Sequence, residues 1–261
     1  MAQDWEIRLV SAFAIFAAVA LWEALAPRRR LNFGRLKRWP SNLAIVAVDA
    51  LVLRALFPVA LAGVALFAQA RGWGLFNVLG APAWLAGLAS ILALDFVIFA
   101  QHVVFHRLPV LWRLHRMHHA DLDYDLTTAL RFHPLEIAIS FALKIAAVLA
   151  LGAPPWAALA FEILLNGLAL FNHANATLPK AVEPLARALI VTPDMHRVHH
   201  SIEPAETHSN FGFNLSIWDR LFGLYRAAPA TGQDGMTIGL PILRDEAELR
   251  LDRMLTQPFR D

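Results

Sequence analysis

The sequence predicts an all-α integral membrane protein, in which a bundle of membrane helices carries a cytoplasmic, histidine-rich helical cap. Three observations support this prediction: the composition, the length of the apolar runs and the clustering of histidines. Hydrophobic residues make up 57% of the 261-residue chain and charged residues only 17%, whereas soluble domains average about 25% charged residues. A soluble monomer, a disordered chain and a collagen-like chain are therefore excluded.

Five apolar stretches reach or approach the roughly 20 residues that a helix needs to cross the hydrocarbon core of a membrane. They are residues 7–26, 43–70, 83–105, 135–151 and 156–171. The last two are short, and only Gly152, Ala153, Pro154 and Pro155 separate them. These helix-breaking residues predict that the two stretches form an antiparallel hairpin, which either crosses or re-enters the membrane. We therefore expect four or five spans.

The first stretch is expected to be an uncleaved membrane anchor. Asp4 and Glu6 precede it, where a signal peptide carries positive charge, and three arginines follow it closely. Basic residues concentrate between positions 28 and 38, with no acidic residue from 27 to 42, which is typical of a cytoplasmic loop. With that loop inside, every histidine falls on or near the cytoplasmic face of a multi-pass inner (cytoplasmic) membrane protein.

Charge and cysteine content narrow the chemistry. Lysine and arginine total 23 against 21 acidic residues, a balance that gives no indication of nucleic-acid binding. Cysteine is absent, which excludes disulfides, thiolate metal sites and a cysteine nucleophile. Any metal ion must therefore be bound by histidines, carboxylates or amides.

Eight of the eleven histidines fall into three clusters with helical spacing. The members are His102 and His106, then His115, His118 and His119, then His196, His199 and His200. Side chains three or four positions apart lie on one face of a helix. Each cluster can therefore present two or three imidazole nitrogens to a metal ion.

The number of clustered histidines exceeds the three or four protein ligands of one zinc ion. Two metal ions, or one ion with further histidines around it, fit this number, and imidazole suits several first-row metals. Besides an enzyme that uses such metal ions for redox chemistry, two other functions would need clustered histidines: a metal transporter or chaperone, and a zinc membrane hydrolase. A transporter should place its ligands along the depth of several spans, and a hydrolase needs a general base beside an open site. No histidine is followed by glutamate, so the zinc-protease motif is absent.

Five sequence strings around these histidines resemble those of one known family. They are HVVFH at 102–106, PVLWRLHRMHH at 109–119, RFHPLE at 131–136, TPDMHRVHHS at 192–201, and NFGFN at 210–214 with WDRLFG at 218–223. On these strings the sequence resembles the fatty acid hydroxylase and sterol desaturase superfamily. The resemblance covers about residues 90–226, which are expected to form the catalytic domain. Residues 1–89 would then be N-terminal transmembrane helices, and 227–261 a polar C-terminal tail.

The resemblance implies a non-haem di-iron oxidoreductase of lipid biosynthesis, a hydroxylase or desaturase that uses O2 on a C–H bond of a membrane lipid such as a sterol or a fatty acyl chain. The di-iron centre itself would do the chemistry, with no separate acid or base. Carried over by position, the iron ligands would be His102, His106, His115, His118, His119, His173, His196, His199 and His200. Residues expected to support these ligands through hydrogen bonds are His133, Asp95, Asn175, Asp194 and His208. At position 208 relatives often carry aspartate, so this chain departs from the pattern there.

Two partners are implied by the same reading. A lipid must approach from the membrane, and Phe99, Phe105, Trp112 and Phe132 are candidates to line its slot. O2 chemistry needs electrons, yet the sequence has no dinucleotide fingerprint, cysteine cluster or haem-attachment motif. A separate electron donor, such as a ferredoxin, cytochrome or reductase, is therefore expected. The sequence leaves the identity of the lipid and the oligomeric state open.

Overall fold

The computed structural model describes residues 2–260, which form helices and connecting loops and no β-strand. The longer helices are α1 (Ala2–Leu25), α2 (Arg35–Leu56), α3 (Leu61–Ala70), α5 (Ala83–Arg107), α6 (Pro109–His119), α7 (Pro134–Leu151) and α8 (Pro155–Asn172). The short helices are α4 (Leu75–Val78), α9 (Glu183–Leu189), α10 (Pro193–His199), α11 (Pro204–Thr207), α12 (Ile217–Leu221), α13 (Gly232–Gly235) and α14 (Leu251–Thr256). Three 3₁₀ helices complete the chain: η1 (Leu126–Leu130), η2 (Glu246–Leu249) and η3 (Gln257–Phe259). The all-helical prediction is confirmed.

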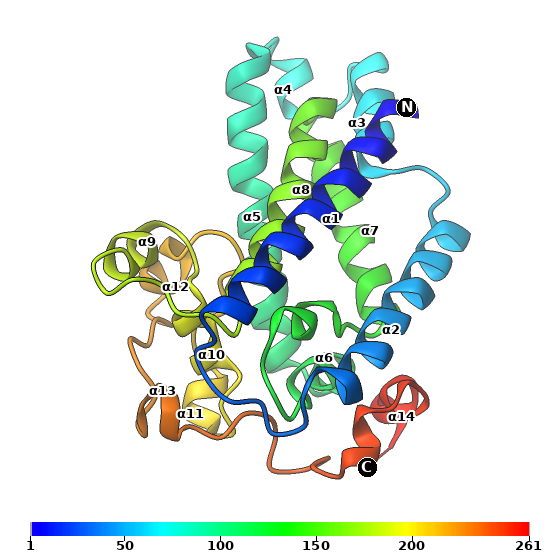
Figure 1. Ribbon diagram of the computed structural model, residues 1–261. Helices are drawn as coiled ribbons and strands as arrows, with labels where there is room; N and C mark the ends of the chain where they lie inside the picture. Colours follow the sequence, from blue (N-terminus) through cyan, green and yellow to red (C-terminus); the bar gives the residue numbers. More distant parts are fainter. Residues whose placement is uncertain (1, 261) are drawn as a thin grey trace.

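Helix α8 lies at the centre of the bundle and packs against α1, α3 and α5, while α7 packs against α2, α3 and α5. In Figure 1, α3 and α4 lie at one end of this bundle, and α6, α10 and the C-terminal segment lie at the other. Aliphatic and aromatic side chains from α3, α5, α7 and α8 fill the core, among them Leu61, Leu94, Phe141 and Phe161.

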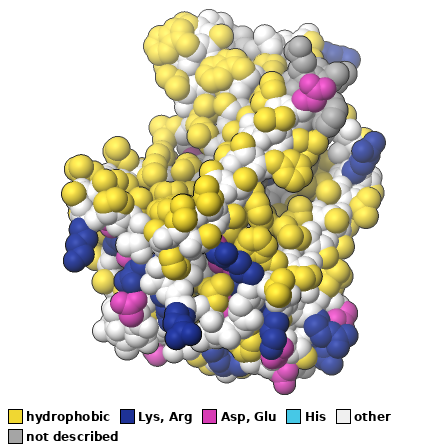
Figure 2. All heavy atoms as spheres, in the orientation of Figure 1, with side chains coloured by type: hydrophobic (Ala, Val, Ile, Leu, Met, Phe, Trp, Pro, Cys, Tyr) yellow, Lys and Arg dark blue, Asp and Glu magenta, His cyan; other side chains and the backbone are white. Residues whose placement is uncertain are grey.

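Five segments are long and apolar enough to cross a membrane, judged by length and composition. They are Glu6–Leu25, Arg35–Val78, Ala83–Arg107, Pro134–Leu151 and Pro155–Asn172. Figure 2 shows hydrophobic side chains over the upper helices, whereas lysine, arginine and acidic side chains gather mainly toward the lower end. This separation is the one that a bilayer around the helices would require.

Proline and glycine set most of the helix boundaries. Proline is the first residue of α6, α7, α8 and α10, where its missing N–H has no intrahelical partner to lose. Gly152 ends α7 in the left-handed conformation with a φ of 67°, which glycine adopts without strain. The predicted turn between α7 and α8 is present, but the two helices pack against α3 and α5 rather than closely against each other.

The second apolar stretch, residues 43–70, does not form one continuous helix. Helix α2 ends at Leu56 and α3 begins at Leu61. Pro58 lies in the gap, and a proline inside a helix removes a backbone hydrogen bond and clashes with the preceding turn. Helix α3 has ten residues, too few to cross the hydrocarbon core alone.

A buried ion-pair network joins α2 to the loop after α6. The Arg38 guanidinium donates to both carboxylate oxygens of Asp121, at 2.8 and 2.6 Å, and to Asp125 Oδ2 at 2.7 Å. Thr128 Oγ1 donates to the same Asp121 carboxylate at 2.9 Å. These three charged side chains are completely buried. The network holds the loop after α6, which leads into η1, against helix α2.

The segment expected as a polar tail folds back along the base of the molecule. Its residues Met236 and Ile238 pack with the buried Tyr124. Met254 of α14 packs with Ile45 of α2 and Met117 of α6 in a second small cluster. The segment therefore contributes apolar contacts to the base of the bundle.

Candidate metal centre

The histidine-bearing elements meet at the lower end of the bundle. His102 and His106 occupy the last two turns of α5, and α6 supplies three further histidines. His173 caps the C-terminus of α8, and His200 caps that of α10. None of the nine predicted ligands is more than 6% exposed. The fold therefore collects in one buried place residues that are up to 98 positions apart, from His102 to His200.

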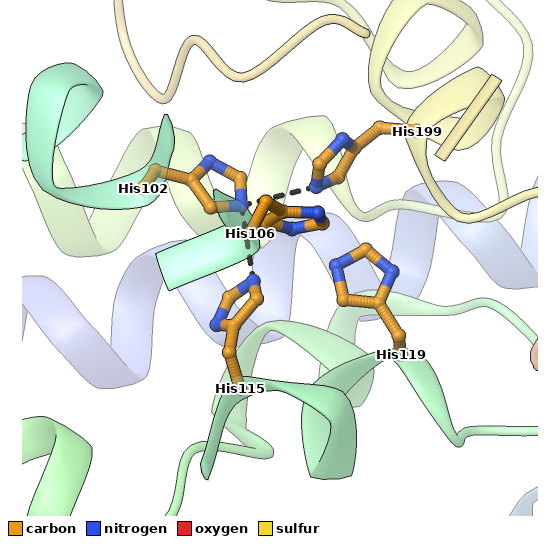
Figure 3. Close-up of side chains that lie close together, drawn as sticks. All are labelled: His102, His106, His115, His119 and His199. Carbon is orange, nitrogen blue, oxygen red and sulfur yellow. Dashed lines mark hydrogen bonds between the residues drawn. The ribbon is translucent and has the colours of Figure 1, made fainter. Parts of the chain in front are cut away.

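The nine histidines form two groups, within each of which the potential ligand nitrogens all lie within 4.8 Å of one another. The first group is His102, His106, His115, His119 and His199. The second group is His118, His173, His196 and His200. Figure 3 shows the rings of the first group pointing toward a common centre.

Each sequence cluster of three histidines is divided between the two groups. His115 and His119 enter the first group, but His118 enters the second. His196 and His200 enter the second group, but His199 enters the first. Successive residues of an α-helix point about 100° apart, so neighbouring histidines face different centres. The expectation that one helical face serves one metal ion is therefore correct only for the pairs four positions apart.

Oxygen acceptors determine which nitrogen of several rings carries the proton. His102 Nδ1 donates to the Phe211 carbonyl oxygen and His199 Nδ1 to that of Ser209, both at 2.7 Å. His115 Nδ1 lies 2.6 Å from Glu136 Oε1. A neutral imidazole has one N–H. The Nε2 atoms of these three histidines therefore carry only a lone pair.

These three Nε2 atoms nevertheless face each other. His102 Nε2 lies 3.0 Å from His115 Nε2 and 3.0 Å from His199 Nε2, the contacts dashed in Figure 3. With no N–H between them, such contacts are repulsive unless a cation lies between the nitrogens. Two nitrogens that are each about 2.1 Å from one ion, and at right angles to each other, are about 3.0 Å apart. The donor set of the first group thus fits a metal ion.

The second group has the same character. His173 Nδ1 donates to the Ala169 carbonyl oxygen at 2.8 Å, which leaves its Nε2 atom as a lone pair 3.1 Å from His118 Nε2. Both ring nitrogens of His196 and of His200 are buried without a hydrogen-bond partner among the described residues. Buried polar atoms are normally paired. Unpaired imidazoles that converge on one point indicate a second ion site.

Burial keeps these rings neutral, which is the form that binds metals. Burial lowers the pKa of His115 to about 3. Burial, partly offset by the hydrogen bond to Ala169, lowers the pKa of His173 to about 3. For His196 and His200 burial and the neighbouring histidines hold the pKa well below its usual range.

The five residues expected to support the ligands lie in different surroundings. His208 Nδ1 is 3.4 Å from His106 Nδ1, so it borders the first group. His133 accepts from Leu135 N at the start of α7 and lies in neither group. Asp95 accepts from Trp218 Nε1 at 2.8 Å.

The remaining two of these residues fix loops around the site. Asn175 Oδ1 accepts from the backbone N–H of Arg29 at 3.0 Å, which ties the loop after α8 to the basic loop after α1. Asp194 pairs with Arg197 within α10. Neither carboxylate nor amide contacts an imidazole of the two groups through a hydrogen bond in residues 2–260.

Glu136 was not singled out from the sequence, yet it accepts the hydrogen bond from His115. It lies in the first turn of α7 and is 3% exposed. The string RFHPLE contains it, but an acid in the first turn of a helix is common because it favours the helix dipole, so the sequence gives no signal that this one is buried. Only the packing of α7 on α6 shows which histidine it contacts. The carbonyl acceptors of Ser209 and Phe211 have no signal in the sequence.

A largely apolar cavity of about 310 Å³ reaches the first group from the membrane helices. His102, His115 and Glu136 line it, and of the four aromatic residues predicted to form a lipid slot, Phe132 lies in its wall. Phe132 also stacks on His118, with ring centroids 4.5 Å apart. A second cavity of about 640 Å³ between α1, α2 and α8 shares the lining residues Val46 and Asn166 with the first. An apolar chain could thus approach the histidines from the lipid side.

The comparison with protein families agrees with the site. A family model described as fatty acid hydroxylase matches residues 87–224, more than half of the chain. This chain belongs to the fatty acid hydroxylase family. The resemblance read from the histidine strings is confirmed, and the five candidate spans together with the family make the chain an integral membrane protein.

Among individual relatives, the chain is 31% identical over 135 residues to the ornithine lipid hydroxylase OlsE of Rhizobium tropici, covering 52% of this chain and 40% of that protein. It is 35% identical over 156 residues to the alkylglycerol monooxygenase of Danio rerio, covering 59% of this chain and 34% of the relative. It is 29% identical over 138 residues to a cholesterol 25-hydroxylase-like protein of Danio rerio, covering 52% and 53%. The chain thus spans about a third to a half of the length of these relatives. No solved structure matches it.

Proposed function

We propose that this protein is an O2-dependent lipid hydroxylase in which each histidine group holds one iron ion. The observation that carries the proposal is the convergence of nine buried, neutral imidazoles on two centres. His102, His106, His115, His119 and His199 would hold one ion, and His118, His173, His196 and His200 the other. Bound iron would supply the redox chemistry that an unactivated C–H bond requires.

The protein's own residues prepare the site for that chemistry. Glu136 holds His115 with Nε2 aimed at the centre, and the carbonyl groups of Phe211 and Ser209 do the same for His102 and His199. Hydrogen bonds of this kind fix the tautomer and the orientation of a metal-binding histidine. Burial of all nine rings excludes bulk water. A lipid in the apolar cavity would have a C–H bond beside His102 and His115, which line it.

Hydroxylation is favoured over desaturation because the relatives compared above are named as hydroxylases or a monooxygenase. Overall, a C–H bond and O2 would be converted to an alcohol and water with two electrons and two protons. Since the sequence has no dinucleotide fingerprint, we propose that a separate redox protein supplies the electrons. Residues 90–226 would be the catalytic domain, residues 1–89 its N-terminal membrane helices, and 227–261 a C-terminal segment along the base.

The basic loop between α1 and α2 supports a cytoplasmic orientation of the site. Residues 26–34 connect α1 and α2 at the same end of the bundle as α6 and α10 (Figure 1). Because short basic loops stay in the cytoplasm, we propose that the histidine groups lie toward the cytoplasmic face. A soluble electron donor would then dock at the base of the bundle, beside the buried histidine groups.

The function is tested by incubating iron-loaded protein in membranes with candidate lipids, ¹⁸O2 and a reductase chain. A lipid should gain one oxygen atom that carries the ¹⁸O label. His102→Ala and His196→Ala, one from each group, should lower product to the background level, while His133→Ala should retain it. Metal-loaded wild-type protein that oxygenates no lipid of a sterol, fatty acyl, ether-lipid and aminolipid panel would count against the proposal.

A further inference from the structure

Asp49 is an unpaired acid in the wall of the cavity that reaches the first histidine group. It lies in α2, is 8% exposed and lines the cavity together with His102 and Glu136. Its Oδ1 atom is buried, and none of the described side chains, which begin at residue 6, donates a hydrogen bond to it or forms an ion pair with its carboxylate. An acidic group inside a membrane span is costly and by default functional.

The other buried acids of the spans have partners. Glu162 pairs with Arg8 at 2.5 Å. Asp95 accepts from the Trp218 indole, and Glu23 accepts from two backbone N–H groups. These acids have structural explanations that Asp49 does not share. The structure therefore leaves the Asp49 carboxyl group available to a molecule that enters the cavity.

The polar part of the cavity wall contains three unpaired acceptor oxygens, and its donor side chains include Ser140, Asn166 and Lys144. Besides Asp49, Gln101 Oε1 and Glu136 Oε2 are buried without a partner among the described residues. Lys144 also lines the cavity, but its ammonium lies over the Phe141 ring at 5.5 Å and makes no ion pair with Asp49. Most of the remaining wall is apolar, including Val46, Leu53 and Ile98 in the same cavity.

We propose that Asp49 binds a hydrogen-bond-donating group of the lipid substrate, a hydroxyl or an ammonium, and thereby places a neighbouring carbon at His102 and His115. The proposal rests on the proposed lipid hydroxylase function and narrows its substrate class. Unpaired acceptors gain a partner from a donor and are left unpaired, or repelled, by a carboxylate. The second cavity between α1, α2 and α8 would take the apolar chain. The substrate is thus an amphiphile with a donor group close to the oxidised carbon, and a free fatty acid is disfavoured.

Binding of single-chain probes to metal-loaded protein in detergent tests this proposal without O2 or reductant. Four probes share one alkyl chain and end in a glycerol ether, an ammonium, a carboxylate or a methyl group. Wild-type protein should bind the glycerol ether, the ammonium probe or both at least about tenfold more tightly than the other two, since hydrogen bonds to a charged group are stronger than those between neutral groups. Asp49→Leu should abolish that preference.

Asp49→Asn separates the two donor chemistries. The amide oxygen still accepts from a hydroxyl but has no charge for an ammonium. A preference that the Asp49→Asn variant retains within about threefold identifies a hydroxyl, and one that falls about tenfold identifies an ammonium. The matched controls are Asp252→Leu and Asp252→Asn, because Asp252 is exposed and remote from the cavity; they should bind every probe as wild-type does.

Measurements of the melting temperature and of lipid oxygenation distinguish the remaining explanations. Because Asp49 has no protein partner, Asp49→Leu should not lower the melting temperature, whereas a structural carboxylate would be costly to remove. Equal binding of the carboxylate and donor probes, or a donor preference that survives Asp49→Leu, overturns the inference and leaves the proposed function standing. Donor-selective binding by a protein that oxygenates no lipid supports the binding site and counts against the hydroxylase function.

Discussion

His115 Nδ1 lies 2.6 Å from Glu136 Oε1, and both side chains are buried. This contact joins the helix that carries three metal-ligand candidates to the first turn of a membrane helix. It fixes the tautomer of His115, and Glu136 also lines the cavity through which a lipid would enter. The orientation of a ligand and the shape of the substrate path thus depend on the same carboxylate.

Replacement of Glu136 should weaken the first metal site. Residues that orient a metal-binding histidine typically contribute about 10–100-fold to metal affinity. We expect a loss in this range for Glu136→Ala and a smaller loss for Glu136→Gln, which keeps an oxygen acceptor. Competition with a chelator measures the affinity, and Glu246→Ala on the exposed Lys37 pair is the control. Unchanged affinity in Glu136→Ala would show that His115 does not need this orientation.

Single histidine variants should remove metal ions one site at a time. His199→Ala belongs to the first group and His118→Ala to the second. Each should lower the metal content from about two ions per chain to about one. The altered group loses a ligand and its ion, whereas the other group keeps all its histidines and its ion. Elemental analysis of protein purified from membranes gives the content.

The matched control for these variants is His133→Ala, which removes a buried histidine outside both groups. It removes the side chain that accepts from Leu135 N at the start of α7, so a modest loss of stability and full metal content are expected. If His133→Ala loses as much metal as His118→Ala, the division into two groups is not what sets the metal content.

Arg38 should be essential for the stability of the helical base. Removing one partner of a buried ion pair costs about 3–5 kcal/mol because a charge is left unpaired. We expect Arg38→Met to lose stability of this order, since it leaves both Asp121 and Asp125 without their shared guanidinium. Lys37→Met removes the neighbouring, half-exposed pair with Glu246 and should cost no more than about 1 kcal/mol. Thermal unfolding in detergent compares the two variants.

The pH dependence of this network follows from Asp121. Burial alone would raise the pKa of this carboxyl group, but Arg38 and Arg131 outweigh burial and lower it to about 2. The stability that the carboxylate contributes is therefore complete above its unfolded pKa of about 3.9 and is lost as the pH falls toward 2. Asp121→Asn should reduce the slope of unfolding free energy with pH in that window. An unchanged slope would assign the acid sensitivity to other groups.

The orientation in the membrane can be read from single cysteines, because the chain has none of its own. Ala205→Cys lies exposed beside α10, and Arg71→Cys lies exposed at the opposite end of the bundle, after α3. An impermeant thiol reagent should label the first only from the cytoplasmic side and the second only from the other side. The reverse pattern would reject the cytoplasmic placement of the histidines.

The sequence by itself determined the helical membrane bundle, the turn between α7 and α8 and the identity of the clustered histidines. These features depend on local properties: the length of apolar runs, prolines at the starts of helices and glycine at a helix end. The break at Pro58 was also encoded locally, but composition alone concealed it because the residues on both sides are apolar.

Only the tertiary structure decided how the histidines divide between two centres. His118 and His119 are adjacent in the chain and face different groups, because a helix turns about 100° per residue and each face meets a different neighbour. Glu136 and the unpaired Asp49 acquire their significance in the same way, from the packing of α7 and α2 around one cavity. Spacing along one helix sets which side chains share a face, but only the packing of the other helices sets what that face contacts.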